Sequence, residues 1–287
     1  MKKFLFLSMC CSMVLWGGQS GLQKMVQPKA TYEASYIDDA SFEGSGAKVS
    51  VIKNKFSLNN KIAGMTYTNW KFSWNQIAKL PFGDQKHTPI SQMHSIGING
   101  NIPYFINDKW FMLTSVSLKS TFEKEMQNSY TLGVFSFASY KIDTENSLTL
   151  GAFANYHPTS TFAMPALSYS YRAREDDGFQ FILGYPRTYA GYYFSSDTLV
   201  RFGMIFSQSV IRLADQSTIS ASGFVEAKDY MSNLGISYTL SEDFSFESDI
   251  LYSLKREFTL YTKEAQKIDT YFIEPSLGIN FKISYLF

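Results

Sequence analysis

The feature that most constrains this fold is a two-residue alternation of side chains, which is clearest over the last eleven residues of the chain. One set consists of large apolar side chains: Leu277, Ile279, Phe281, Ile283, Tyr285 and Phe287. The other set is mostly small or polar: Gly278, Asn280, Lys282, Ser284 and Leu286. Because successive side chains of a strand point to opposite faces of its sheet, the pattern predicts a strand with one apolar and one largely polar face.

The composition indicates a surface that does not all face water. Aromatic residues make up 17% of the 287 residues and charged residues only 18%, whereas soluble domains carry about a quarter charged residues. The mean hydropathy of −0.13 is nevertheless too polar for a bundle of membrane helices. These values are typical of a β-barrel with one apolar and one polar face. A secreted β-sandwich is the alternative that they leave open.

Residues 1–20 have the pattern of a signal peptide. Lys2 and Lys3 precede an apolar run from Phe4 to Trp16, which is too short to span a bilayer. Both cysteines, Cys10 and Cys11, lie in this segment. We therefore expect a mature chain without disulfides, thiolate metal sites or a cysteine nucleophile.

A short polar segment at residues 21–28, expected to be periplasmic, precedes a long succession of strands at residues 29–287. The loops between the expected strands tend to alternate in length. The long ones are Asn75–Ser91, Glu123–Asn128, Ala214–Ala227 and Thr262–Lys267. The short ones are Asn107-Asp108, Asp143–Asn146, Ser195–Asp197 and Ser241–Asp243. Outer-membrane barrels have this asymmetry, with short periplasmic turns and longer external loops.

A sheet in lipid has to close on itself, because its edge N–H and C=O groups have no water to bond. We therefore expect an all-β fold, a closed antiparallel up-and-down transmembrane β-barrel of about 14 strands in the bacterial outer membrane. The count falls to 12 if a short pair such as Phe179–Tyr185 and Tyr189–Phe194 does not form.

The strand expected at Phe244–Tyr261 places its charges on one face. Glu247, Asp249, Lys255 and Glu257 share the parity opposite to the aromatic residues, whereas Arg256 breaks the pattern and is interpreted as lying near the outer rim. A charge on the lipid face costs about 2–4 kcal/mol at the midplane. These four residues are therefore expected to line the lumen beside Asn280 and Lys282. They could set the selectivity of a pore, or they could form a neutralised network that fills the lumen.

The end of the chain resembles the closing strand of bacterial outer-membrane β-barrels. This resemblance implies that Phe281, Ile283, Tyr285 and Phe287 form a C-terminal assembly signal, with the barrel-assembly machinery and outer-membrane lipids as partners. Without Lys2 and Lys3 the chain carries 24 basic and 25 acidic residues. Such a neutral chain shows no electrostatic pattern for binding nucleic acid.

No motif for a cofactor, metal ion or catalytic centre stands out. The histidines His87, His94 and His157 show no metal-ligand spacing. The adjacent His94 and Ser95 raise the alternative of a membrane-embedded lipid hydrolase, although no partnering carboxylate is identifiable. We expect no enzymatic activity.

The segment from Leu183 to Phe194, LGYPRTYAGYYF, contains a Gly-Tyr-Pro hairpin. It resembles an uncharacterised family of outer-membrane β-barrel proteins common in Bacteroidetes-type bacteria, as do the strand Tyr32–Tyr36 and the strand end at Ser57-Leu58-Asn59. The resemblance implies no reaction or ligand. From the architecture we expect a narrow pore or passive small-solute transporter. A structural or surface-interaction barrel with a side-chain-filled lumen is the alternative.

Overall fold

The computed structural model describes residues 27–173, 178–185 and 187–287, which form one continuous sheet. Its strands are β1 (Lys29–Ser41), β2 (Lys48–Asn59), β3 (Ala63–Asn75), β4 (Gln92–Phe105), β5 (Trp110–Phe122), β6 (Tyr130–Lys141), β7 (Asn146–Tyr156), β8 (Phe162–Arg172), β9 (Gly178–Tyr185), β10 (Arg187–Ser195), β11 (Thr198–Arg212), β12 (Phe224–Thr239), β13 (Phe244–Tyr261), β14 (Lys267–Ile273) and β15 (Ser276–Leu286). One 3₁₀ turn, η1 (Ile77–Lys79), interrupts the loop after β3. The expected signal peptide lies outside the described residues, as does most of the segment 21–28.

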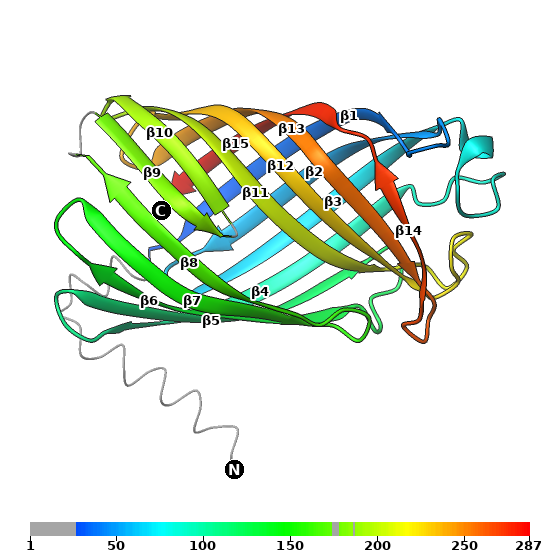
Figure 1. Cartoon of the computed structure of the whole chain (residues 1–287), viewed down its shortest axis with the longest axis horizontal. Coiled ribbons are helices and arrows are strands. Elements are labelled where there is room, and N and C mark those ends of the chain that lie inside the picture. The colour runs from blue at the N-terminus through cyan, green and yellow to red at the C-terminus, as the bar shows by residue number, and fades with distance from the viewer. Residues whose placement is uncertain (1–26, 174–177, 186) are drawn as a thin grey trace, which may run out of the picture.

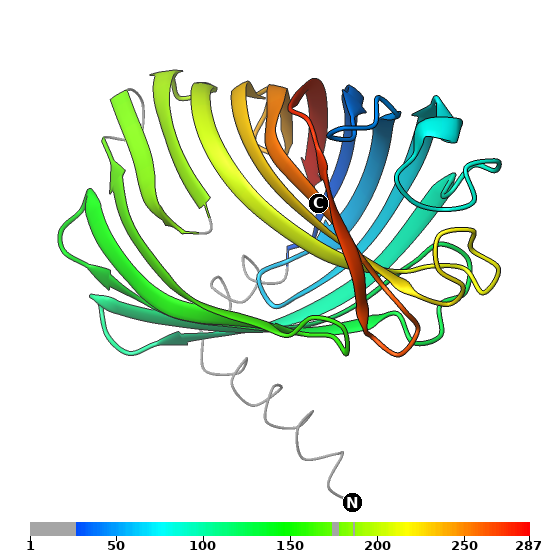
Figure 2. The ribbon, with the colours of Figure 1, turned by 45° about the vertical axis from the view of Figure 1, so that its right-hand side comes forward.

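The sheet closes into a barrel (Figures 1 and 2). Neighbouring strands pair antiparallel, and β1 meets β15 in a register from Lys29↔Leu286 to Ile37↔Gly278. β15 also pairs with the first half of β13, whereas β14 pairs with the second half. β14 and β15 therefore occupy one position in the wall, interrupted at Glu274 and Pro275. In the described part of the chain the wall has fourteen strand positions, and the predicted all-β barrel is confirmed.

The break in the last wall position has a simple cause. The sequence predicts one strand from Asp269 to Phe287, but Pro275 lacks the backbone N–H that a ladder requires. Neighbouring backbone groups instead tie the end of β14 to the tip of the β1–β2 hairpin. The Glu274 N–H donates to the Ser41 carbonyl at 2.9 Å, and the Glu43 N–H donates to the Phe272 carbonyl at 3.0 Å.

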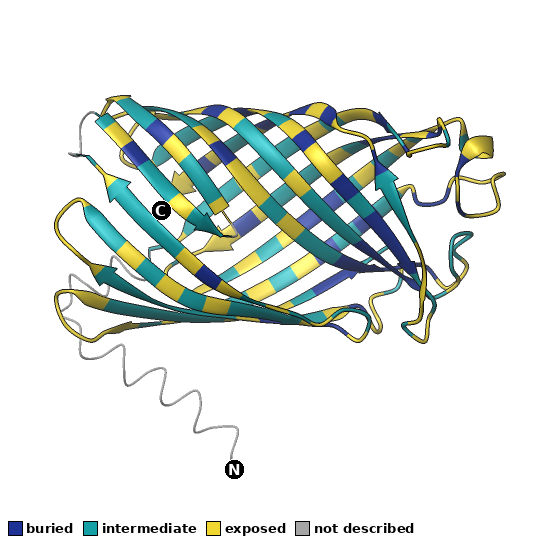
Figure 3. Cartoon of the chain, viewed as in Figure 1, coloured by how far each residue is buried: buried dark blue, intermediate teal, exposed yellow. Residues whose placement is uncertain are grey.

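The outer face of the barrel is apolar in strand after strand. On β4 the side chains of Ile96, Ile98 and Ile102 are exposed, whereas Ser95 on the inner face is buried. Figure 3 shows the same alternation of exposed and less exposed residues along most strands. Soluble monomers rarely expose contiguous apolar patches beyond a few hundred Å². This face is therefore suited to contact with apolar surroundings.

The two ends of the barrel differ. The long-loop end carries loops 42–47, 76–91, 123–129, 157–161, 213–223 and 262–266, and the short-turn end carries turns such as 60–62, 106–109, 142–145 and 240–243. Lys29 pairs with Leu286 and also with Asn59, which precedes the turn 60–62, so both ends of the barrel sequence lie at the short-turn end. No helix among the described residues has the length and apolar character needed to cross a membrane.

The wall is shortest along the barrel axis at the β9–β10 hairpin, whose strands end well before β8 and β11 (Figure 1). β9 ends opposite Leu167 of β8, and β10 begins opposite Ile205 of β11, so residues 162–166 and 206–212 extend beyond the hairpin. Aromatic rings meet across this interruption, with the centroids of Phe162 and Phe206 6.2 Å apart. The tip of the β7–β8 hairpin reaches over it, and Ser160 Oγ donates to Glu226 Oε1 at 2.8 Å.

Candidate functional site

The lumen contains a cavity of about 780 Å³ whose lining changes from charged to apolar along the barrel. The charged belt is defined here as Glu33, Lys53, Lys55, Lys119, Arg201, Asp229, Glu247, Asp249, Arg256 and Lys282. The apolar part lies toward the long-loop end and includes Phe42, Val49, Trp70, Phe72, Trp74, Ile211 and Phe258. Both groups come from alternate positions of the strands, which is why they share the inner face.

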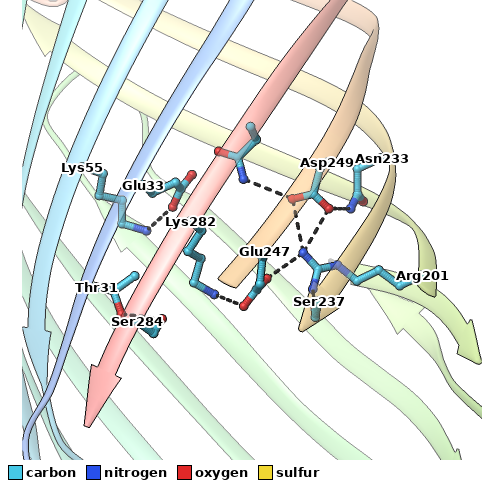
Figure 4. A network of polar contacts seen from close by, with 11 residues as sticks. Thr31, Glu33, Lys55, Arg201, Asn233, Ser237, Glu247, Asp249, Lys282 and Ser284 are labelled. Atoms are coloured by element: carbon cyan, nitrogen blue, oxygen red, sulfur yellow. Dashed lines mark hydrogen bonds and ion pairs between the residues drawn. The ribbon is translucent and has the colours of Figure 1, made fainter. Parts of the chain in front are cut away.

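Arg201 of β11 is the centre of the largest ion network in the belt (Figure 4). Its Nη2 lies 2.6 Å from Glu247 Oε2 and 3.0 Å from Asp249 Oδ1. Lys282 Nζ donates to the other oxygen of Glu247 at 2.7 Å. The two basic and two acidic groups neutralise one another, and the Arg201 and Asp249 side chains are only 12% and 5% exposed.

Strand register explains how Asp249 reaches this position. Gly235 of β12 and Asn280 of β15 pair with Asp249 from either side. A Cβ atom at Gly235 would lie 2.0 Å from Asp249 Oδ1, so only glycine leaves room for the carboxylate. The amides of Asn233 and Asn280 donate to the two carboxylate oxygens at 2.9 and 3.1 Å. Both carboxylate oxygens of Asp249 are therefore hydrogen-bonded, by Arg201 and by two side-chain amides.

Four of the six predicted lumen residues meet in this network: Glu247, Asp249, Asn280 and Lys282. Lys255 and Glu257 do not join it, and they form a separate pair with Nζ 2.7 Å from Oε1. Glu257 is among the residues that line the cavity, whereas Lys255 is not and is about half exposed. A shift in register accounts for the outward position of Lys255, because Lys255 pairs with Tyr230 whereas Ser253 pairs with the adjacent Met231. The extra residue between them reverses the alternation, which a bulge does to any strand.

Beyond the bulge Arg256 occupies the inner face that the sequence assigned to its neighbours. It is 8% exposed, and Phe258 on the same side of the strand is buried in the core. Its Nε donates to Ser253 Oγ at 3.1 Å, and the Ser253 hydroxyl donates to Asp229 Oδ1, also at 3.1 Å. Arg256 therefore lies on the inner face of the wall, in the half of β13 nearer the long-loop end.

A third group of charges comes from β1, β2 and β5. Glu33 lies between two lysines, with its carboxylate oxygens 3.5 Å from the Nζ atoms of Lys53 and Lys55. Lys119 donates to Ser209 Oγ at 3.1 Å and makes no ion pair with a carboxylate in the described ranges. Lys53, Lys55 and Lys119 all line the same cavity. This lysine cluster thus has three cations and one anion.

Sequence reasoning missed the lysine cluster, Arg201, Asp229 and Asn233, whereas Asn280 was among the predicted lumen residues. A signal for them exists in each strand. Lys119, for example, alternates with the exposed Leu118, and Arg201 alternates with the exposed Phe202. Extending the parity argument from β13 to all strands would have placed these groups on the inner face. It would not have shown which of them meet.

The long-loop end of the lumen is closed by a hydrophobic core. Side chains from the inner faces of β2, β4, β11, β12 and β13 gather there, and the loop 76–91 adds Leu80, Phe82 and Ile90, all nearly buried. The Phe82 ring lies 5.3 Å from that of Phe42 and 5.6 Å from that of Phe258. The Trp74 indole N–H donates to the Ile90 carbonyl at 2.6 Å. The loop is thus a plug that packs into the barrel mouth.

The residues of the predicted C-terminal signal all lie on the outer face of β15 and its end. Phe281, Ile283, Tyr285 and Phe287 are exposed, whereas Asn280 and Ser284, at alternate positions of the strand, are buried. The side chains are thus available to an external surface. Their placement follows from the alternation of the strand.

The residues considered for chemistry do not assemble into a reactive site. His94 and Ser95 are consecutive in β4 and therefore face opposite sides of the wall. His94 Nδ1 shares a hydrogen bond of 2.8 Å with the hydroxyl of the exposed Tyr67, whereas the buried Ser95 bonds Thr121 Oγ1 at 3.0 Å. His87 bonds Asp84 in a loop. No group of three potential metal ligands occurs within residues 27–173, 178–185 and 187–287.

No family model matches this chain, and no curated protein matches it either. Its fold is similar to that of solved outer-membrane proteins at very low sequence identity. The KdgM porin is 9% identical, with 90% of this chain and 99% of that chain covered and a TM-score of 0.41. A mutant of the TodX monoaromatic hydrocarbon channel is 8% identical, with 91% and 89% covered and a TM-score of 0.48. The translocator domain of the autotransporter NalP from Neisseria meningitidis is 8% identical, with 100% and 97% covered and a TM-score of 0.42. Identity this low says nothing about function.

Proposed function

We propose that this protein is a bacterial outer-membrane channel for small solutes, with its long-loop end closed in the conformation described here. The observation that carries the proposal is the 780 Å³ cavity lined by charged groups inside a closed barrel. The apolar outer face supports the membrane location, because large exposed apolar side chains on every strand are suited to contact with hydrocarbon. A lumen of charged and small side chains surrounded by such a wall is typical of pores.

The lining of the lumen differs between its two ends. Toward the short-turn end the inward side chains are small, and pairs such as Thr31 with Ser284 and Thr66 with Ser57 bond each other at 3.2 and 3.3 Å. Toward the long-loop end Leu80, Phe82 and Ile90 of loop 76–91 pack into the hydrophobic core of the mouth. Solute flow through the barrel therefore requires this loop to move, whereas entry from the short-turn end does not.

Single-channel conductance in planar bilayers tests the proposal. We expect low or intermittent conductance from the mature wild-type barrel, and a several-fold increase when residues 78–89 are replaced by a short Gly-Ser linker. Heat-modifiable migration on gels and membrane fractionation show that both proteins are folded and inserted. Silence of both folded proteins would refute the channel.

The hydrophobic core favours a second candidate, a structural or surface-interaction barrel whose lumen is closed by side chains. In that case removal of the plug would destabilise the barrel without producing conductance. The same pair of proteins thus distinguishes the two functions.

We also propose that the exposed C-terminal side chains are read by the barrel-assembly machinery. Phe287→Ser should lower the amount of folded barrel in the outer membrane of expressing cells. Refolding of the purified variant in detergent should be unchanged, because Phe287 is 62% exposed and contributes little packing. Equal loss of folding in both settings would contradict a role in recognition.

A further inference from the structure

The charged belt is not electrically neutral, and its excess charge is confined to one place. The belt as defined above has six basic and four acidic groups. Among the described residues, three more charged side chains line the cavity and have partners outside the belt: Lys228 pairs with Glu226, Glu257 pairs with Lys255, and Arg187 lies over the Tyr189 ring. Arg201 and Lys282 balance Glu247 and Asp249, and Arg256 lies beside Asp229, its register partner. The remaining members form the lysine cluster of three ammonium groups and one carboxylate, in which Lys53 and Lys55 contact Glu33 and, within the described part of the chain, Lys119 bonds only Ser209. The whole excess of two positive charges therefore lies in that cluster.

The lysine cluster directly adjoins the apolar part of the cavity. Lys53 is the cross-strand partner of Trp70, and the next inward pair along the same two strands is Val51 with Phe72. Across the lumen Lys119 reaches Ser209 of β11, and the next inward residue of β11 is the buried Ile211. The boundary between cationic and apolar lining thus runs through both walls at one level of the cavity.

We propose that this boundary is a binding site for amphipathic organic anions, that is, small carboxylates with an apolar body. The carboxylate binds Lys119 together with Lys53 or Lys55, and the apolar body lies against Trp70 and Phe72. The inference deepens the proposed function by naming a substrate class, and the binding site itself does not require that solute crosses the barrel.

The chemistry of the site favours this class over the alternatives. A partly buried ammonium without a carboxylate is costly, and an anion that bonds it offsets that cost. An inorganic anion would use the lysines but leave the aromatic wall in contact with water. An apolar molecule would use Trp70 and Phe72 but leave the cations uncompensated. Only a molecule with both parts satisfies both walls.

Tryptophan fluorescence of the mature barrel in phospholipid nanodiscs measures binding directly. In a Trp110→Phe background the remaining indoles, Trp70 and Trp74, both line the cavity. We expect octanoate to change their emission saturably, and octan-1-ol and acetate to bind at least tenfold more weakly. Equal affinity for octan-1-ol would show an apolar pocket without an anion site, and equal affinity for acetate would show a cation cluster without an apolar part. Either result would overturn the proposal.

Variants separate the lysine cluster from general effects of charge. Lys119→Gln should weaken octanoate binding at least tenfold and leave octan-1-ol unaffected, and Lys55→Gln should act in the same direction. Neither removes an acid's only partner, so both barrels should fold. The matched control is Lys71→Gln, because Lys71 is the exposed neighbour of Trp70 on the other face of β3. Unchanged octanoate affinity in the Lys119 variant, or an equal loss in the Lys71 variant, would refute the site.

The proposed anion-binding site and the proposed channel function can be refuted independently of each other. Octanoate binding without conductance in the plug-replaced barrel would refute the channel and leave the site. Conductance without saturable octanoate binding would refute the site and leave the channel.

Discussion

Arg201→Gln removes the central cation of the largest ion network while keeping a polar side chain of similar length. The substitution leaves Glu247 and Asp249 with one cation, Lys282, which contacts only Glu247. Asp249 retains the two asparagine amides but is 5% exposed. Removing one partner of a buried ion pair costs about 3–5 kcal/mol, whereas removing one partner of an exposed pair costs about 0–1 kcal/mol. Because both partners are buried, we expect the free energy of unfolding to fall by about 3 kcal/mol.

A companion variant tests the physical reason. Arg201→Gln combined with Glu247→Gln removes the excess negative charge, so we expect it to recover about half of the loss. Urea unfolding of the mature barrel in lipid vesicles, followed by tryptophan fluorescence and checked for reversibility, measures both differences. A loss below about 1 kcal/mol for Arg201→Gln would mean that water screens the network as it screens a surface pair. A double variant less stable than the single variant would refute the charge argument.

Three further predictions concern the packing around the lumen. Gly235→Ala should lower the free energy of unfolding by about 1–3 kcal/mol, because the added Cβ collides with Asp249. Gly100→Ala is the control and should leave the stability unchanged, because no atom lies within 4 Å of its Cβ; equal urea midpoints for the two variants would contradict this reasoning. Phe82→Ala should weaken the docking of loop 76–91 by about 3–5 kcal/mol. Proteolysis after Lys79 or Lys86 should become faster with little change in global unfolding, and an unchanged cleavage rate would argue against the plug. In the loop after β7, burial lowers the pKa of His157 to about 4, and the Thr159 N–H and hydroxyl both bond its Nδ1. If the loop opens, His157 regains the ordinary histidine pKa of about 6.5 and takes up a proton first, so the closed form of the loop should lose stability as the pH falls from about 6.5 to 4. A spin label at residue 161 should gain mobility over that range in the wild type but not in His157→Phe. Identical pH profiles of the two proteins would refute the assignment.

The barrel could be predicted from the sequence because alternation is a local property. Each strand shows its two faces without reference to its neighbours, as β15 does with Phe281 against Asn280. The even number of strands follows from the turns, and the structure bears it out. The break at Pro275 could have been read from the proline itself.

The pairing inside the lumen could not be predicted in the same way. Which inward side chains meet depends on strand tilt and shear, which are properties of the closed barrel. Arg201 and Asp249 are 48 residues apart in the chain, and neither local sequence indicates that the two side chains would pair. The bulge that redirects Lys255 arises from the pairing of β12 with β13, so the alternation of β13 alone could not reveal it.

The packing of loop 76–91 into the barrel mouth was not recognised in the sequence, for a different reason. Pro81, Gly83 and Pro89 give residues 75–91 the composition of a solvent-exposed loop. Leu80, Phe82 and Ile90 are apolar residues among them, and they turn inward because the barrel mouth offers an aromatic surface. Large apolar side chains in an expected loop were therefore the available signal.

The meeting of β1 with β15 determines when the barrel can form. Thr31 and Ser284 bond each other although 253 positions separate them, so the contact that completes the ring is among the most distant in the chain. Folding slows as such contacts come to dominate. Until residues 276–286 dock, β1 and the first half of β13 each present a free edge that can recruit another chain. A copy cut short before Ser276 would not form a slightly smaller ring. It would remain an open sheet prone to aggregate.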